Sequence, residues 1–118
     1  MKTLLLAVLA LASVSAFAKN CDNVESNYDM KICASENLEE QDKRLNEVYA
    51  KLMNKLDKGE QKKLKIAQRA WITYRDANCD FAAGEMRGGT GEGLIYVSCL
   101  GSMTSDRADE LQDSVDFR

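Results

Sequence analysis

The sequence predicts an all-α fold: a small antiparallel three-helix domain with a glycine-rich loop and two disulfides. Three observations lead to this prediction. Apolar residues recur at steps of three and four along three long segments. Glycines gather at 84–93, between the second and third segments. The chain also has four cysteines, an even number that is typical of two disulfides in a small domain of an oxidising compartment.

The first eighteen residues have the pattern of a secretory signal peptide. One lysine precedes an apolar run, and small residues stand at Ala16 and Ala18. The apolar run is too short for a transmembrane helix; a retained amphipathic anchor is the alternative. We therefore expect a signal peptide at 1–18 and a helical domain at 19–118. Because Lys19 and Asn20 precede the first cysteine, we expect a periplasmic or secreted bacterial protein without a lipid anchor.

The net charge of the chain favours some classes of binding partner over others. The formal net charge is −3, and loss of Lys2 with the signal peptide makes it one unit more negative. Nucleic acids and anionic membranes favour basic protein faces, so both are disfavoured as partners. A mildly acidic domain is better suited to a basic protein.

The first helix is expected at 26–57, with an interruption near Ser35 as an alternative. Its apolar stripe is formed by Leu38, Leu45, Tyr49, Leu52 and Leu56. Gly59 is expected to end the helix.

The second helix is expected at 60–83. Six residues share one face by their spacing and are predicted to face the core: Leu64, Ala67, Trp71, Tyr74, Asn78 and Phe81. The opposite face carries Lys, Arg, Thr and Asp and is expected to be solvated.

The third helix is expected at 92–117, with an apolar stripe from Val97 to Val115. Two features weaken this prediction. Gly101 would lie in the helix interior, where glycine costs about 1 kcal/mol relative to alanine. Ile, Tyr and Val within 94–98 also favour a short strand as the competing interpretation.

Short connections make successive helices antiparallel, which allows an estimate of register. A first turn near residues 58–59 places Asp42 opposite Arg75, and we predict a structural, bidentate ion pair between them. A second turn near residue 89 places Cys79 opposite Cys99. Four cysteines allow three pairings, and this register favours Cys79–Cys99 with Cys21–Cys33 by elimination.

The sequence offers little to support catalysis. The chain has no histidine, which excludes Ser-His-Asp triads, Cys-His pairs and histidine-ligated metals. Oxidised cysteines are not nucleophiles, and Asp76 and Asp80 lie on the solvated helix face. The glycine run lacks the Gly-Lys-Ser/Thr ending of a phosphate-binding loop. We therefore expect no enzyme, no catalytic residue, no cofactor and no metal.

The glycine-rich loop has two interpretations. One is a flexible hairpin between disulfide-linked helices. The other is a recognition loop, because loops held on rigid scaffolds often carry binding. The candidate partner-binding residues are Met86, Arg87, Gly88, Gly89, Thr90, Glu92 and Tyr96.

Several motifs taken together resemble a known family. They are M-K-I-C at 30–33, L-N-E-V-Y at 45–49, A-Q-R-A-W-I-T-Y-R-D-A-N-C at 67–79 and T-S-D-R-A-D-E-L at 104–111. They look like the LprI-type lysozyme-inhibitor domain, formerly a domain of unknown function with four cysteines and the signature Q-x-x-W-x-x-Y-R-D-x-x-C. The resemblance covers essentially all of 19–118. The signature residues are the ones assigned above to the framework, so they support the fold and do not locate a binding site.

Two function classes follow. The resemblance implies an exported binding protein that inhibits lysozyme, and a strongly basic lysozyme would suit an acidic domain through electrostatic steering. The alternative is a periplasmic stress, structural or immunity-type protein that binds another envelope partner and has no effect on lysozyme.

Overall fold

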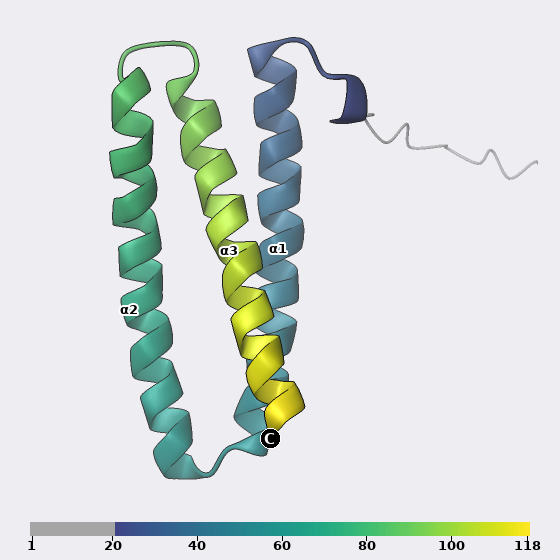
Figure 1. Ribbon diagram of the computed structural model, residues 1–118, viewed down its shortest axis with the longest axis vertical. Coiled ribbons are helices and arrows are strands. Elements are labelled where there is room, and N and C mark those ends of the chain that lie inside the picture. Colours follow the sequence, from purple (N-terminus) through teal and green to yellow (C-terminus); the bar gives the residue numbers. More distant parts are fainter. Residues whose placement is uncertain (1–20) are drawn as a thin grey trace, which may run out of the picture.

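The computed structural model describes residues 21–118 as three long helices. These are α1 (Asn27–Lys55), α2 (Lys58–Ala83) and α3 (Glu92–Phe117), with short 3-10 turns η1 (Cys21–Asn23) and η2 (Gly84–Met86) (Figure 1). The predicted all-α fold with two disulfides is confirmed. The signal peptide expected at 1–18 lies outside the described residues. Within those residues, no helix combines the length and apolarity that crossing a bilayer requires.

Side-chain caps define where α1 and α2 begin. The Ser26 hydroxyl accepts from the backbone N–H of Asp29 at 3.1 Å, and the Asp57 carboxylate accepts from that of Glu60 at 2.8 Å. Each satisfies a backbone donor that a helix leaves free in its first turn. Because Asp57 caps α2 so early, α1 ends at Lys55, and Gly59 lies inside the first turn of α2. The expectation that Gly59 ends the first helix was therefore wrong.

Two alternatives from the sequence are excluded. The first helix continues through Ser35, whose hydroxyl donates to its own helix at the carbonyl of Lys31, 2.9 Å away. Residues 94–98 are helical and not a strand. Helical spacing of the apolar residues outweighs the strand preference of Ile, Tyr and Val here, because the segment continues into the buried helical face that runs from Leu100 to Val115.

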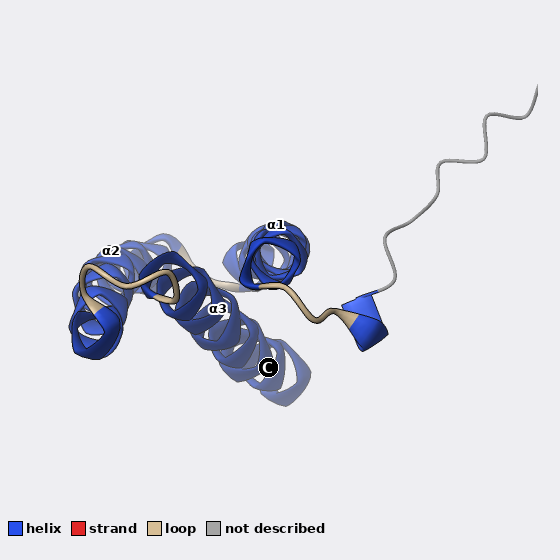
Figure 2. Cartoon of the chain, turned by 90° about the horizontal axis from the view of Figure 1, so that it is seen from above, coloured by secondary structure: helices blue, strands red, loops and turns tan. Residues whose placement is uncertain are grey.

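α3 is the central helix of the domain. In two perpendicular views it lies between α1 and α2 (Figures 1 and 2), and α1 and α2 have few direct contacts with each other. The chain runs in opposite directions in consecutive helices, so α1 and α3 are parallel. Their contacts keep a nearly constant sequence separation: 63 residues for Asn27–Thr90, 61 for Arg44–Ser105 and 60 for Lys55–Val115.

The core forms mainly where α1 meets α3. Its buried members are Leu45, Val48, Leu52, Leu64, Ala108, Leu111 and Val115. Gly101 lies where α3 packs directly against α1. A Cβ there would stand 2.9 Å from the Asn37 side-chain nitrogen and 3.7 Å from the Leu38 Cα. This glycine, which weakens the prediction of a third helix, thus allows α3 to pack tightly against α1.

α2 turns a different face to the core than the sequence predicts. Leu64 is buried and Trp71 packs against the core, as expected. However, Tyr74 is 62% exposed and Phe81 81% exposed, so their assignment to the core was wrong. At about 100° per residue, Phe81 lies about 160° around the helix from Cys79. Since Cys79 must face α3 to form its disulfide, Phe81 points to solvent.

Candidate functional site

Both predicted disulfides are confirmed. Cys79 and Cys99 join the end of α2 to the start of α3, with 5.5 Å between their Cα atoms. Cys21 and Cys33 join η1 to α1, with a Cα–Cα distance of 5.8 Å. Cys79 is fully buried, and its Sγ lies 3.7 Å from Met103 Sδ. The Cys79–Cys99 disulfide closes the base of the glycine-rich loop. It also fixes the separation of α2 and α3, the two helices that the loop connects.

Hydrogen bonds within the loop give it a defined shape. The Gly88 N–H donates to the Glu92 carboxylate at 3.0 Å, and the Gly89 N–H donates to the Met86 carbonyl at 2.9 Å. Gly88 has a φ of 79°, a left-handed conformation that glycine adopts without strain. Arg87 lies 3.6 Å from Asp80 and 3.7 Å from Glu92. The loop therefore presents an ordered turn at one end of the molecule (Figure 1).

Most of the predicted loop residues gather around one open cavity of about 520 Å³. Gly89, Thr90, Glu92 and Tyr96 all line it. Arg87 instead lines a neighbouring cavity of about 490 Å³. Met86 is 45% exposed but lies over Gly91, where an added Cβ would meet the Met86 methyl at 3.1 Å. The structure thus brings the expected residues to one end of the domain, over two adjoining hollows.

The cavity also has residues that the sequence did not suggest. Lys31 on α1 and Asp80 on α2 both line it. The Lys31 ammonium lies across Gly93, where an added Cβ would be 2.9 Å away. Asn27 donates to the Thr90 hydroxyl at 3.3 Å. The start of α1 reaches this loop because α1 packs along α3. The predicted antiparallel order implied that these two helices are parallel, but not that they are neighbours.

The loop end suits binding more than chemistry. It combines the cations Lys31 and Arg87 with the carboxylates of Asp80, Glu85 and Glu92, all at least partly exposed. Within residues 21–118, one group has the spacing of a metal site: Cys21, Cys33 and Glu36. Both of its sulfurs are held in a disulfide, which leaves no thiolate for a metal.

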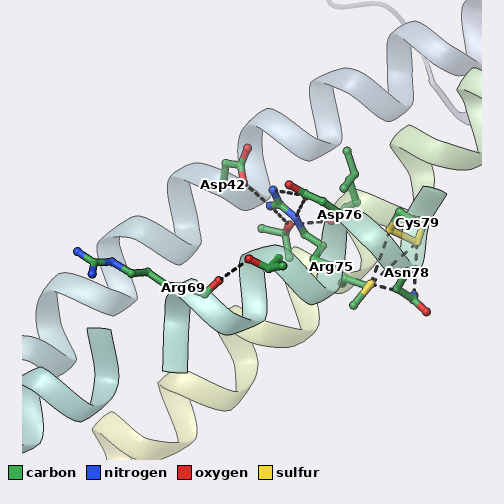
Figure 3. A network of polar contacts seen from close by, with 11 residues as sticks. Asp42, Arg69, Arg75, Asp76, Asn78 and Cys79 are labelled. Atoms are coloured by element: carbon green, nitrogen blue, oxygen red, sulfur yellow. Dashed lines mark hydrogen bonds and ion pairs between the residues drawn. A yellow bond between two sulfur atoms is a disulfide. The ribbon is translucent and has the colours of Figure 1, made fainter. Parts of the chain in front are cut away.

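Arg75 connects all three helices away from the loop. Its guanidinium lies 3.7 Å from Asp42 on α1, 3.0 Å from Asp76 on α2 and 3.3 Å from the Thr104 hydroxyl on α3 (Figure 3). The separation from Asp42 exceeds hydrogen-bond length, so the bidentate geometry expected for this pair is not formed. Arg75 also lies 5.2 Å from the centre of the Trp71 ring. These contacts are structural and contribute nothing to the loop cavity.

Comparison with known proteins places these features in a family. The sequence pattern of the family described as "Lysozyme inhibitor LprI" matches residues 18–111. An uncharacterized protein of Rhizobium meliloti (strain 1021) is 35% identical over 124 residues, which covers 94% of this chain and 89% of that protein.

A solved structure has the same fold. The crystal structure of a DUF1311 family protein from Pseudomonas putida KT2440 superposes with a TM-score of 0.71 at 22% identity, covering 81% of this chain and all of that one. At this identity the likeness concerns the fold alone. The match over most of the chain and the four paired cysteines lead to one conclusion: this protein belongs to the LprI lysozyme inhibitor family.

Proposed function

We propose that this protein is an exported inhibitor of lysozyme that binds its target with the loop end of the domain. The match to the lysozyme inhibitor family over residues 18–111 carries the proposal. The signal-peptide pattern at 1–18 and the two disulfides support a periplasmic or secreted location, because disulfides persist in oxidising compartments.

The geometry of the loop end supports its role as the binding surface. Arg87 and Thr90 are exposed on a turn held by the Cys79–Cys99 disulfide and by the hydrogen bond from Gly88 to Glu92. A loop that is ordered before binding loses little conformational entropy on binding, which favours affinity.

The charge of the domain supports a basic target. The formal net charge is −3, and the three carboxylates at the loop end, Asp80, Glu85 and Glu92, outnumber its two cations, Lys31 and Arg87. A strongly basic lysozyme would be steered toward this end, and the steering would weaken as salt screens the charges.

The test is lysozyme turnover of cell-wall substrate with the purified, oxidised protein titrated in. Lysozymes of the c-type and g-type are assayed at low and moderate salt. We expect saturable, stoichiometric inhibition of one type, weaker at the higher salt. No inhibition by a large molar excess would contradict the proposal and favour the alternative of another envelope partner.

A matched pair of variants locates the binding surface. Arg87→Ala removes an exposed arginine from the loop, and Arg118→Ala removes one at the opposite end of the molecule (Figure 1). We expect Arg87→Ala to weaken inhibition about tenfold or more, as for an arginine at an interface centre, with an unchanged melting temperature. Arg118→Ala should inhibit like the parent protein. Equal inhibition by both variants would place the binding surface elsewhere.

A further inference from the structure

The outward face of α2 carries an apolar stripe that the domain leaves uncovered. Its large members are Ile66, Tyr74 and Phe81, which are 60%, 62% and 81% exposed. Ala70 and Ala77 lie between them and are also exposed. Successive members are separated by four, four, three and four residues, so all five share one side of the helix. We call these five residues the outer stripe.

The fold explains why the outer stripe is free. α2 contacts α3 through Leu64, Trp71, Arg75 and Cys79 and has few contacts with α1. It is an outer helix in Figures 1 and 2, with no described element on its far side. A contiguous apolar patch on a rigid helix marks a protein contact, because water disfavours it in a soluble domain.

The outer stripe is symmetric about a point between Thr73 and Tyr74. Ile66 and Phe81 lie at equal distances on either side of this point, and so do Ala70 and Ala77. If two copies of α2 pack antiparallel about a two-fold axis there, Ile66 of each copy meets Phe81 of the other. The alanines then face each other and permit close approach, and the two Tyr74 rings meet beside the axis. A two-fold interface requires this kind of self-complementary surface.

The charges beside the stripe are complementary across the same axis. Arg69, Asp76 and Asp80 lie along one edge of it. Antiparallel pairing puts Arg69 of one copy level with residue 78 of the other, between Asp76 and Asp80. Among the described residues the Arg69 guanidinium has no ion-pair partner, and it extends away from the Arg75 network in Figure 3. Parallel pairing would instead set this edge against the opposite edge of the partner stripe, so only the antiparallel arrangement brings Arg69 to the acidic residues.

We propose that the outer stripe is a homodimer interface, in which α2 of one copy packs antiparallel against α2 of a second copy. One helix pair buries less area than a standard stable interface, so the association should depend on concentration. The two glycine-rich loops would lie on opposite sides of the two-fold axis, about 30 Å apart along the helices, because α2 ends at Ala83, about ten residues beyond the axis. Ala77 and Phe81 also line the cavity beside Arg87, so the dimer interface borders the candidate lysozyme surface. The cavity lined by Gly89, Thr90 and Tyr96 contains no residue of the outer stripe.

Sedimentation equilibrium of the purified, oxidised protein tests the proposal. We expect the weight-average mass to rise from monomer toward dimer as the concentration increases from micromolar to millimolar. Phe81→Ser should raise the dissociation constant on the order of a hundredfold, because each dimer loses two buried aromatic side chains. Phe117→Ser is the matched control: Phe117 is 93% exposed at the end of α3, away from the stripe. Both variants should keep the parent's circular dichroism.

A charge exchange tests the antiparallel register. Arg69→Glu should weaken the dimer about tenfold by placing like charges together. Adding Asp80→Arg to Arg69→Glu should restore association, because the exchanged charges attract again across the axis. A protein that stays monomeric at millimolar concentration would overturn the proposal. So would a dimer unaffected by Phe81→Ser, or a monomer that uses Phe81 to bind phospholipid vesicles.

Discussion

Single residues show how a charged group can organise a small helical core. Arg75 projects from α2 between the other two helices, and its side chain is 16% exposed. Its acidic partners Asp42 and Asp76 are about half exposed, which keeps their carboxylates hydrated. Thr104 is fully buried, and its hydroxyl donates to the Leu100 carbonyl at 2.7 Å while accepting from Arg75. Each polar group in this network therefore has a partner or water.

Replacing Arg75 tests how much this network stabilises the fold. An arginine paired with a fully buried carboxylate would cost several kcal/mol to remove. Because the carboxylates here remain hydrated, we expect Arg75→Met to lower the free energy of unfolding by only about 1–2 kcal/mol. Chemical denaturation measures this value. Asp42→Asn should change it by less than about 0.5 kcal/mol; a loss as large as that of Arg75→Met would show that the two act as one buried pair.

At the scale of elements, the contact between α1 and α3 depends on small side chains. Gly101, Thr104 and Ala108 follow one another at steps of three and four, and all are buried. They let two parallel helices approach while Leu45, Leu52 and Leu111 fill the remainder of the core. The close approach in turn brings the start of α1 to the glycine-rich loop, where Lys31 enters the candidate site.

Two substitutions of Gly101 separate helix propensity from packing. In Gly101→Ala the new Cβ meets mainly the amide at the end of the Asn37 side chain, and alanine favours the helix by up to about 1 kcal/mol. We expect a stability within about 1 kcal/mol of the parent. Gly101→Leu must push α1 away and should cost about 1–3 kcal/mol. Thermal or urea unfolding measures the stability of each variant. Equal stability of the two variants would mean that the helices are not in tight contact here.

At the scale of the whole molecule, α2 is the least integrated helix. α1 and α3 share most of the core, whereas α2 packs on α3 from one side and leaves its outer stripe exposed. The Cys79–Cys99 disulfide should therefore contribute more to the stability of the fold than Cys21–Cys33, which joins an exposed 3-10 turn to α1.

Removing each disulfide in turn tests this difference. We expect Cys79→Ala/Cys99→Ala to cost about 3 kcal/mol and to speed hydrogen exchange in α2 before α1 or α3. Cys21→Ala/Cys33→Ala should cost less, because this disulfide closes a shorter loop and joins an exposed 3-10 turn to α1 instead of linking two helices of the bundle. Uniform acceleration of exchange in all three helices would contradict the view of α2 as a separable element.

The sequence by itself determined the helices, their order and the disulfide pairing. Apolar spacing located the three helices to within a few residues, because helical periodicity depends on local geometry alone. Short connections set the register that brought Cys79 beside Cys99. The glycine spacing also located the loop whose residues line the candidate site.

Only the tertiary structure decided which helices are neighbours and which face of α2 is buried. On α2 the apolar stripe favoured Tyr74 and Phe81, while the cysteine register favoured the opposite side of the helix. The covalent bond from Cys79 to α3 allows only one rotation of α2 about its axis, whereas apolar side chains tolerate exposure. The disulfide therefore determines which face of α2 is buried, and the outer stripe stays exposed. The position of Lys31 beside the loop also depends on tertiary structure. It requires α1 to pack on α3, a long-range contact that local sequence patterns do not predict.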